Sequence, residues 1–202
     1  MSTRDYFFSI TSIEPIRAVV GSRDETLVNA LIETYASQYD PATLEDEDVQ
    51  DDIEERRSWA DSMINCERVP KKEPGCWNYF VEDIARHLGL EPDSNLPFNE
   101  GWKHNCSWQP YRNIVKRHVT RQSGRSLAHL EDGRPLRGKR IDYDGCLFGW
   151  LTADEVKELH QSLSQLHDAL IANTDFVDFH ETLVESLKIV SSDSRDLFMG
   201  AC

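Results

Sequence analysis

RDYFFSIT, residues 4–11, brings aromatic and β-branched side chains together near the start of the chain, and this composition predicts a short β-strand. At the other end, DLFMGAC (residues 196–202) is apolar as well and could pair with the first strand. A third short strand is predicted at CLFGW, residues 146–150. The sequence therefore predicts a small sheet built from the N-terminal segment, residues 145–150 and the C-terminal segment.

Apolar residues recur at helical spacing through most of the chain between these strands. Two S/T-x-x-E capping boxes, Ser22–Glu25 and Thr152–Glu155, mark helix starts because each can satisfy two free backbone donors. The pattern predicts helices near residues 12–20, 24–38, 45–65, 76–90, 110–121, 152–170 and 176–190. Residues 69–75 and 123–145, rich in Pro, Gly and Arg, are predicted to be connections. The fold class is thus α+β and mainly helical, with about six or seven helices.

Composition supports one globular domain over residues 1–202, because 202 residues with five Trp and eight Phe can bury a substantial core. The first fifteen residues lack the apolar segment of a signal peptide. No apolar run approaches the ~20 residues that a membrane span needs. We therefore expect a cytoplasmic protein that does not associate with a membrane.

Five cysteines stand at irregular spacings and form no CxxC pair. Without a secretory signal, reduced thiols are expected, with Cys76 and Cys146 as small core residues and Cys202 at an exposed end.

The formal net charge of −14 argues against nucleic-acid binding, which needs clustered cations. The charge is uneven, however. Residues 101–140 hold ten Lys or Arg and two acids, a net of +8, so the remaining residues carry −22. This asymmetry is consistent with a polar surface for a partner.

KHNCSWQPYRNIVKRH, residues 103–118, concentrates reactive and basic side chains. His104 and Cys106 are two possible zinc ligands, but a structural site needs four and the second pair is missing, so no metal is predicted. Cations near Cys106 could activate its thiol, although spacing identifies no orienting Asp or Asn. Trp102 and Trp108 could form a platform for a ligand.

If Pro110 lies in the first turn of a helix, Tyr111 and His118 fall on its apolar face and the cations on its outer face. A solvated basic face is the more frequent meaning of such a pattern, and an anion site is the alternative. The candidate functional surface of this region comprises Trp102, His104, Cys106, Trp108, Arg112, Lys116, Arg117 and Arg121.

Eight acids lie between Glu45 and Glu55, at the start of the helix predicted from residue 45. Such a run is usually a solvated helix face, and negative charge also suits a helix N-terminus. As a functional alternative, the face could bind a basic protein through Glu45, Asp46, Asp51 and Asp52.

Four segments in order, GSRDETLVNAL (21–31), WNYFVEDIARHLG (77–89), FGWLTADEVKEL (148–159) and SRDLF (194–198), resemble a bacterial family classed as a domain of unknown function. Its members have about 190–200 residues, a first helix preceded by GS and acids, and a G-[WY]-L-T-x-x-E element. The resemblance spans most of the chain except residues 101–140. It implies a bacterial origin and a single compact domain, and it carries over no catalytic residue.

No GxxxxGK[ST], GxGxxG, GxSxG or HExxH motif is present. Together with the acidic charge, this favours a non-enzymatic cytoplasmic binding or regulatory module without a cofactor, whose partner is a basic protein. A partner-neutralising role, as in toxin–immunity pairs, is one version of it. The alternatives are an enzyme or anion-binding protein with a site near residues 102–118, and nucleic-acid binding through residues 112–121.

Overall fold

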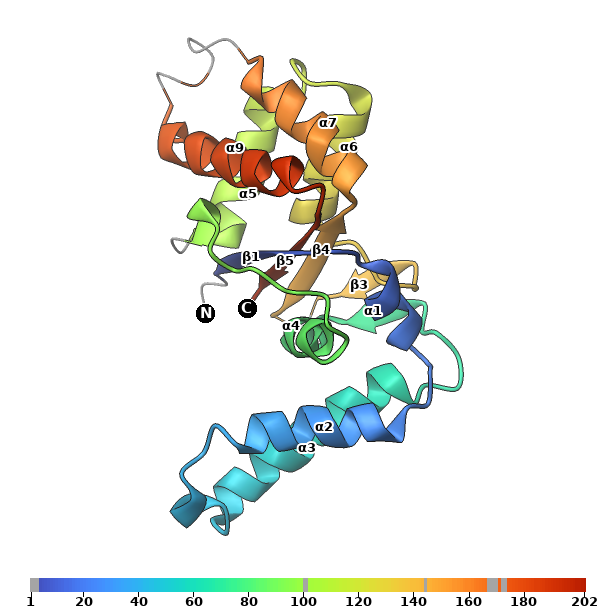
Figure 1. Cartoon of the computed structure of the whole chain (residues 1–202). Coiled ribbons are helices and arrows are strands. Elements are labelled where there is room, and N and C mark those ends of the chain that lie inside the picture. The colour runs from blue at the N-terminus through green and yellow to red at the C-terminus, as the bar shows by residue number, and fades with distance from the viewer. Residues whose placement is uncertain (1–3, 100–101, 144, 167–170, 172–173) are drawn as a thin grey trace.

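A three-stranded antiparallel sheet of order β1-β5-β4 lies at the centre of the computed structural model, which describes residues 4–99, 102–143, 145–166, 171 and 174–202 (Figure 1). β1 (Asp5–Ile10) and β4 (Leu147–Leu151) flank β5 (Asp196–Ala201). The last strand in sequence therefore occupies the middle of the sheet.

Both faces of this sheet are covered, which explains why its strands are apolar without regular alternation. Phe8 of β1 belongs to one core and its neighbour Phe7 to the other. Successive side chains of a strand point to opposite faces, so the sheet separates two hydrophobic cores.

On one face lie α5 (His104–Val115), α6 (Arg121–Glu131), α7 (Ala153–Ser164) and α9 (Val177–Ser192), drawn above the sheet in Figure 1. Aromatic rings fill the space between them: Trp108, Tyr111 and Phe179 are fully buried. Phe98 of the short 3-10 helix η3 (Pro97–Asn99) stacks on Phe7 with ring centroids 4.3 Å apart.

α1 (Glu14–Val19), η2 (Gly75–Trp77) and α4 (Asn78–His87) cover the other face. Beyond them, α2 (Glu25–Ala36) and α3 (Glu47–Ile64) form a helical hairpin, with η1 (Pro41–Thr43) between the helices. Figure 1 shows the hairpin projecting away from the sheet.

A separate two-stranded parallel sheet pairs β2 (Lys72–Pro74) with β3 (Arg140–Asp142). Glu73 of β2 is fully buried, and its carboxylate accepts backbone N–H bonds from Leu136 at 2.6 Å and Arg137 at 2.8 Å. This carboxylate orders the loop that precedes β3, because the buried N–H groups would otherwise lack partners.

The mainly helical α+β prediction is confirmed, and so is the sheet from the two ends of the chain and the segment near residue 147. The box at Thr152 is confirmed too, with both reciprocal hydrogen bonds present. The box at Ser22 is wrong: Asp24 caps α2 by accepting from the Leu27 N–H.

The connection predicted over residues 123–145 is also wrong, since it contains most of α6 and all of β3. Leu127 and Leu130 of α6 are fully buried against the sheet core, and this tertiary contact outweighs the local Gly and Arg content. Likewise, residues 69–75 contain β2.

The start of α5 was predicted near Pro110, but the helix begins at His104 and Pro110 lies inside it. Proline removes one helical hydrogen bond. Burial of Trp108 and Tyr111 on the two sides of Pro110 offsets this loss. The helix ends at Val115, so His118 leaves the predicted apolar face and is exposed.

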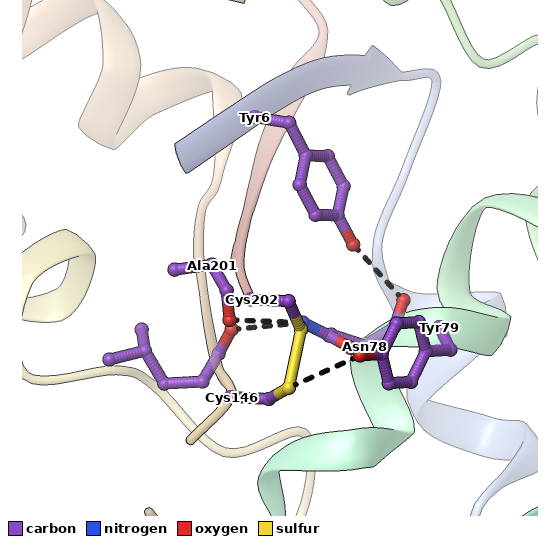
Figure 2. Close-up of a disulfide and its surroundings, with 7 residues drawn as sticks. Tyr6, Asn78, Tyr79, Cys146, Ala201 and Cys202 are labelled. Atoms are coloured by element: carbon purple, nitrogen blue, oxygen red, sulfur yellow. Dashed lines mark hydrogen bonds between the residues drawn. A yellow bond between two sulfur atoms is a disulfide. The ribbon is translucent and has the colours of Figure 1, made fainter. Parts of the chain in front are cut away.

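The expectation that all cysteines are reduced is wrong as well, because Cys146 and Cys202 form a disulfide (Figure 2). Neither is a core residue: Cys146 is half-buried and Cys202 exposed. The two cysteines are far apart in sequence, so their pairing could not be predicted from spacing. The register of β4 and β5 brings them together. Cys76 is buried as predicted.

Candidate functional site

The acidic segment forms the outer part of the α2–α3 hairpin. Near the sheet, the two helices contact each other through buried side chains such as Leu31 and Met63. Backbone bonds from Gly21 to Met63 and from Arg23 to Ile64 fasten this inner end. Toward the outer end, burial decreases and polar side chains replace apolar ones.

Carboxylates dominate the outer part. Glu33 and Asp40 add two acids to the eight between Glu45 and Glu55, so residues 33–55 hold ten carboxylates and no Lys or Arg. All of them except Asp52 are exposed. None of the nine exposed carboxylates is in an ion pair with a residue that the structure describes. We call residues 33–55 the acidic tip.

Asp52 differs from the other nine because it points toward α2. Its carboxylate accepts hydrogen bonds from the hydroxyls of Tyr35, at 2.5 Å, and Tyr39. These two bonds, that of Tyr35 first, lower the pKa of Asp52, and the bond to Asp52 raises the pKa of Tyr39. Asp52 therefore stays charged while it fastens the end of α2 to α3.

Two cations, Arg56 and Arg57, follow the acidic tip directly, and aromatic rings enclose Arg56. Its guanidinium carbon lies 4.1 Å from the ring centroid of Tyr79, 4.8 Å from that of Tyr35 and 4.9 Å from that of Trp59. Such cation–π contacts hold the charge inside the protein. Arg56 is half-buried and makes no ion pair with a carboxylate in the described part of the chain, although its charge helps to lower the pKa of Asp52.

The second predicted surface, near residues 102–118, is divided by the fold. Trp108 is fully buried and donates its indole N–H to Asp5 at 2.7 Å, so it cannot serve as a platform. Trp102 is half-buried against Phe179, with ring centroids 5.3 Å apart. Cys106 is exposed on α5, and the side chain of His104 is outside the described part of the structure.

Within the described residues, no group of three or more His, Cys, Asp or Glu side chains could hold a metal ion. His160, on α7, has a pKa lowered by burial. His167, seven residues further along the chain, is outside the described residues.

Three of the four cations of the predicted basic face, Lys116, Arg117 and Arg121, are exposed, whereas the fourth, Arg112, is paired with acids. Arg112 is half-buried and bound to Glu131 at 2.7 Å and Asp132 at 3.0 Å. Lys116, Arg117 and Arg121 are exposed, and no carboxylate of the described chain pairs with them. Arg121 belongs to α6, where Arg125 is a further exposed cation one turn on.

Sequence reasoning identified the acids of the tip but not the residues that shape it. Tyr35, Trp59 and Tyr79 come from three helices and Tyr39 from the turn after α2, and no local motif connects them. The one available signal was the i, i+4 spacing of Tyr35 and Tyr39, whose hydroxyls lie 3.0 Å apart in the structure.

Comparisons of the chain with protein-family models, with curated proteins and with solved structures found no match. None of the described helices combines the length and apolar character that a bilayer span requires. The function is therefore inferred from the charge and geometry of the acidic tip and of the basic face.

Proposed function

We propose that the chain is a non-enzymatic binding or regulatory module whose acidic tip binds a basic protein partner. The observation that carries this proposal is the set of nine exposed carboxylates, on a projecting hairpin, that have no counter-ion in the described chain. Like charges at this density repel one another. A partner rich in Lys and Arg would remove that repulsion.

The shape of the hairpin supports the same function. A projecting element can enter a concave basic surface, and its field would accelerate encounter with such a partner. The rigid base formed by Arg56, Asp52 and their tyrosines limits the ordering that binding requires. Neutralisation of a basic toxin-like protein in a bacterial cytoplasm is the concrete version that we favour.

Charge reversal at Glu45, Asp51 and Glu54 tests the proposal. All three are exposed, whereas Asp52 is left unchanged because it fastens α2 to α3, and Asp46 because it is the N-cap residue of α3. The control reverses three exposed acids outside the acidic tip, Glu67, Asp175 and Glu181, which produces the same change in net charge.

Immobilised protein would be incubated with a bacterial extract, and the captured proteins identified by mass spectrometry. We expect basic proteins that elute with salt, loss of capture by at least tenfold in the Glu45→Lys, Asp51→Lys, Glu54→Lys variant, and retention by the control. Equal capture by both variants would overturn the proposal, provided that circular dichroism shows both to be folded.

A second candidate is anion or nucleic-acid binding at Lys116, Arg117, Arg121 and Arg125, because these cations are exposed and unpaired among the described residues. The burial of Trp108 and Tyr111 leaves this surface without the aromatic rings that would stack on bases. An enzyme site near Cys106 has less support, since its thiol is exposed and the side chain of the nearby His104 lies outside the described part of the structure.

A further inference from the structure

The disulfide closes the end of the sheet where β4 begins and β5 ends. Leu147 of β4 pairs with Ala201 of β5, so Cys146 and Cys202 face each other one position farther, with Cα atoms 4.5 Å apart. Cys202 is exposed and Cys146 half-buried. A small thiol in solution can therefore reach the pair without unfolding of the sheet.

The buried side-chain amide of Asn78 contacts the disulfide. The Asn78 side chain, only 1% exposed, donates N–H bonds to the Cys202 sulfur at 3.0 Å and to the carbonyls of Leu147 and Ala201 at 3.3 and 3.4 Å (Figure 2). Since these two carbonyls can only accept, they fix the amide nitrogen on the side of the sulfur.

The amide oxygen of Asn78 has no hydrogen-bond partner in the described chain. The group of Asn78 that faces Cys202 is the N–H donor, and a thiolate accepts a hydrogen bond more strongly than a disulfide sulfur does. The Asn78 amide therefore stabilises a Cys202 thiolate more than the disulfide and favours reduction.

The other sulfur is connected to the acidic hairpin through Tyr79. Its hydroxyl lies 3.4 Å from the Cys146 sulfur and must be the donor, since the disulfide has no proton. The ring of Tyr79 stacks on Trp59 of α3 at 5.8 Å and lies against the guanidinium of Arg56. Arg56 in turn covers Tyr35, which binds Asp52. These contacts form an unbroken path from the disulfide to the acidic tip.

We propose that Cys146–Cys202 is a reversible exchange site for low-molecular-weight thiols, and that Tyr79 and Arg56 transmit its redox state to the α2–α3 hairpin. An external thiolate attacks the more exposed Cys202 sulfur. The S–S bond breaks, and Cys146 leaves with the electron pair as a thiolate that accepts the hydrogen bond from Tyr79. A second external thiol then releases Cys202.

The net reaction converts the protein disulfide and two external thiols into two protein thiols and one external disulfide. The protein gains two electrons and two protons. A regulatory meaning, control of partner binding by redox state, rests on the proposed function. The exchange chemistry and its transmission to α3 can be measured on the free protein.

Exchange is tested by titration of the folded protein with reduced and oxidised glutathione, followed by alkylation and peptide mass spectrometry. We expect Cys146 and Cys202 to become alkylated together while far-ultraviolet circular dichroism stays unchanged. If the pair is reduced only together with loss of the circular dichroism signal, the disulfide is a structural crosslink and the proposal is overturned.

Transmission is tested by amide hydrogen exchange of peptides covering residues 51–60. Reduction should accelerate exchange there severalfold, and the Cys146→Ser, Cys202→Ser variant should match the reduced protein. The matched control is Tyr79→Phe, which keeps the ring but removes the bond to sulfur, so its exchange should no longer depend on redox state.

Equal exchange in the oxidised and reduced wild type, or an undiminished difference in Tyr79→Phe, would refute transmission. The hydrogen-exchange experiment contains no partner, so its failure would not contradict the proposal that the acidic tip binds a basic protein. Conversely, failure of the capture experiment would not contradict thiol exchange at Cys146–Cys202.

Discussion

The indole N–H of Trp108, on α5, donates a 2.7 Å hydrogen bond to the carboxylate of Asp5, at the start of β1. Both side chains are buried. The bond joins the first strand to a helix that follows it by about a hundred residues, and it crosses the aromatic core between the sheet and the upper helices. It adds a directional polar contact to the apolar packing of α5.

Removal of this hydrogen bond should destabilise the protein without unfolding it. Asp5→Ala removes the carboxylate that accepts from the buried indole N–H of Trp108, and we expect a loss of about 1–3 kcal/mol in the free energy of unfolding. Urea denaturation followed by tryptophan fluorescence measures it. The control Asp51→Ala, at an exposed position of α3, should change the free energy by less than half as much. A loss no larger than that of the control would contradict the stabilising role of this bond.

Asp196 should make stability depend on pH. Its carboxylate accepts from the backbone N–H groups of Ile13 at 2.7 Å and Ala153 at 2.8 Å, at the starts of α1 and α7. Burial nevertheless raises the pKa of Asp196. The folded protein thus holds this proton more tightly than the unfolded chain, and ionisation lowers stability as the pH rises from about 4 through the folded pKa.

The Asp196→Asn side chain does not ionise, so stability should lose this dependence on pH. It also has one oxygen acceptor in place of the two carboxylate oxygens. We expect a loss of about 1–2 kcal/mol at pH 7 and a larger loss near pH 4.5, where the wild type is relieved of its buried charge. Urea denaturation at several pH values measures both. Asp193→Asn, at an exposed carboxylate, is the control. A loss that shrinks toward pH 4.5 would show that the sign is wrong.

Two glycines of the sheet should differ in their tolerance of alanine. A Cβ at Gly149 would overlap the backbone carbonyl of His129 on α6, whereas a Cβ at Gly200 would overlap the ring of Tyr6. Backbone cannot move aside as a side chain can. We expect Gly149→Ala to cost about 3 kcal/mol and Gly200→Ala about 1 kcal/mol, measured by thermal and urea unfolding. Equal costs would contradict this ordering.

The cations Lys116, Arg117, Arg121 and Arg125 should not bind duplex DNA at physiological salt. The net charge of −14 opposes a polyanion, and Trp108 and Tyr111 are buried. We expect no gel shift at about 150 mM salt. A shift at that salt, abolished when Lys116, Arg117, Arg121 and Arg125 are all changed to Gln, would instead favour the nucleic-acid alternative. A variant with the exposed Arg68, Lys71, Lys139 and Arg140 changed to Gln, which removes the same number of charges, serves as the control.

Local chemistry made part of this fold predictable. The capping box at Thr152 forms because its two hydrogen bonds join residues only three apart. Runs such as RDYFFSIT and DLFMGAC are apolar enough to require burial, so their assignment to strands follows from the residues alone. The acids of residues 45–55 other than Asp52 are likewise exposed, because an ionised carboxylate without a partner stays in water.

What the sequence by itself determined is therefore the class of the fold, the segments that form the sheet and the acidic character of one helix. Only the tertiary structure decided that β5 lies in the centre, that Pro110 is tolerated inside α5, and that Cys146 meets Cys202. The tertiary structure also decided that the rings of Tyr35, Trp59 and Tyr79 enclose Arg56. The reason is physical. Helix and strand propensities and helix caps depend on residues that are close in sequence. Strand order, cross-strand pairing and the aromatic rings around Arg56 depend on which distant segments pack in the same core.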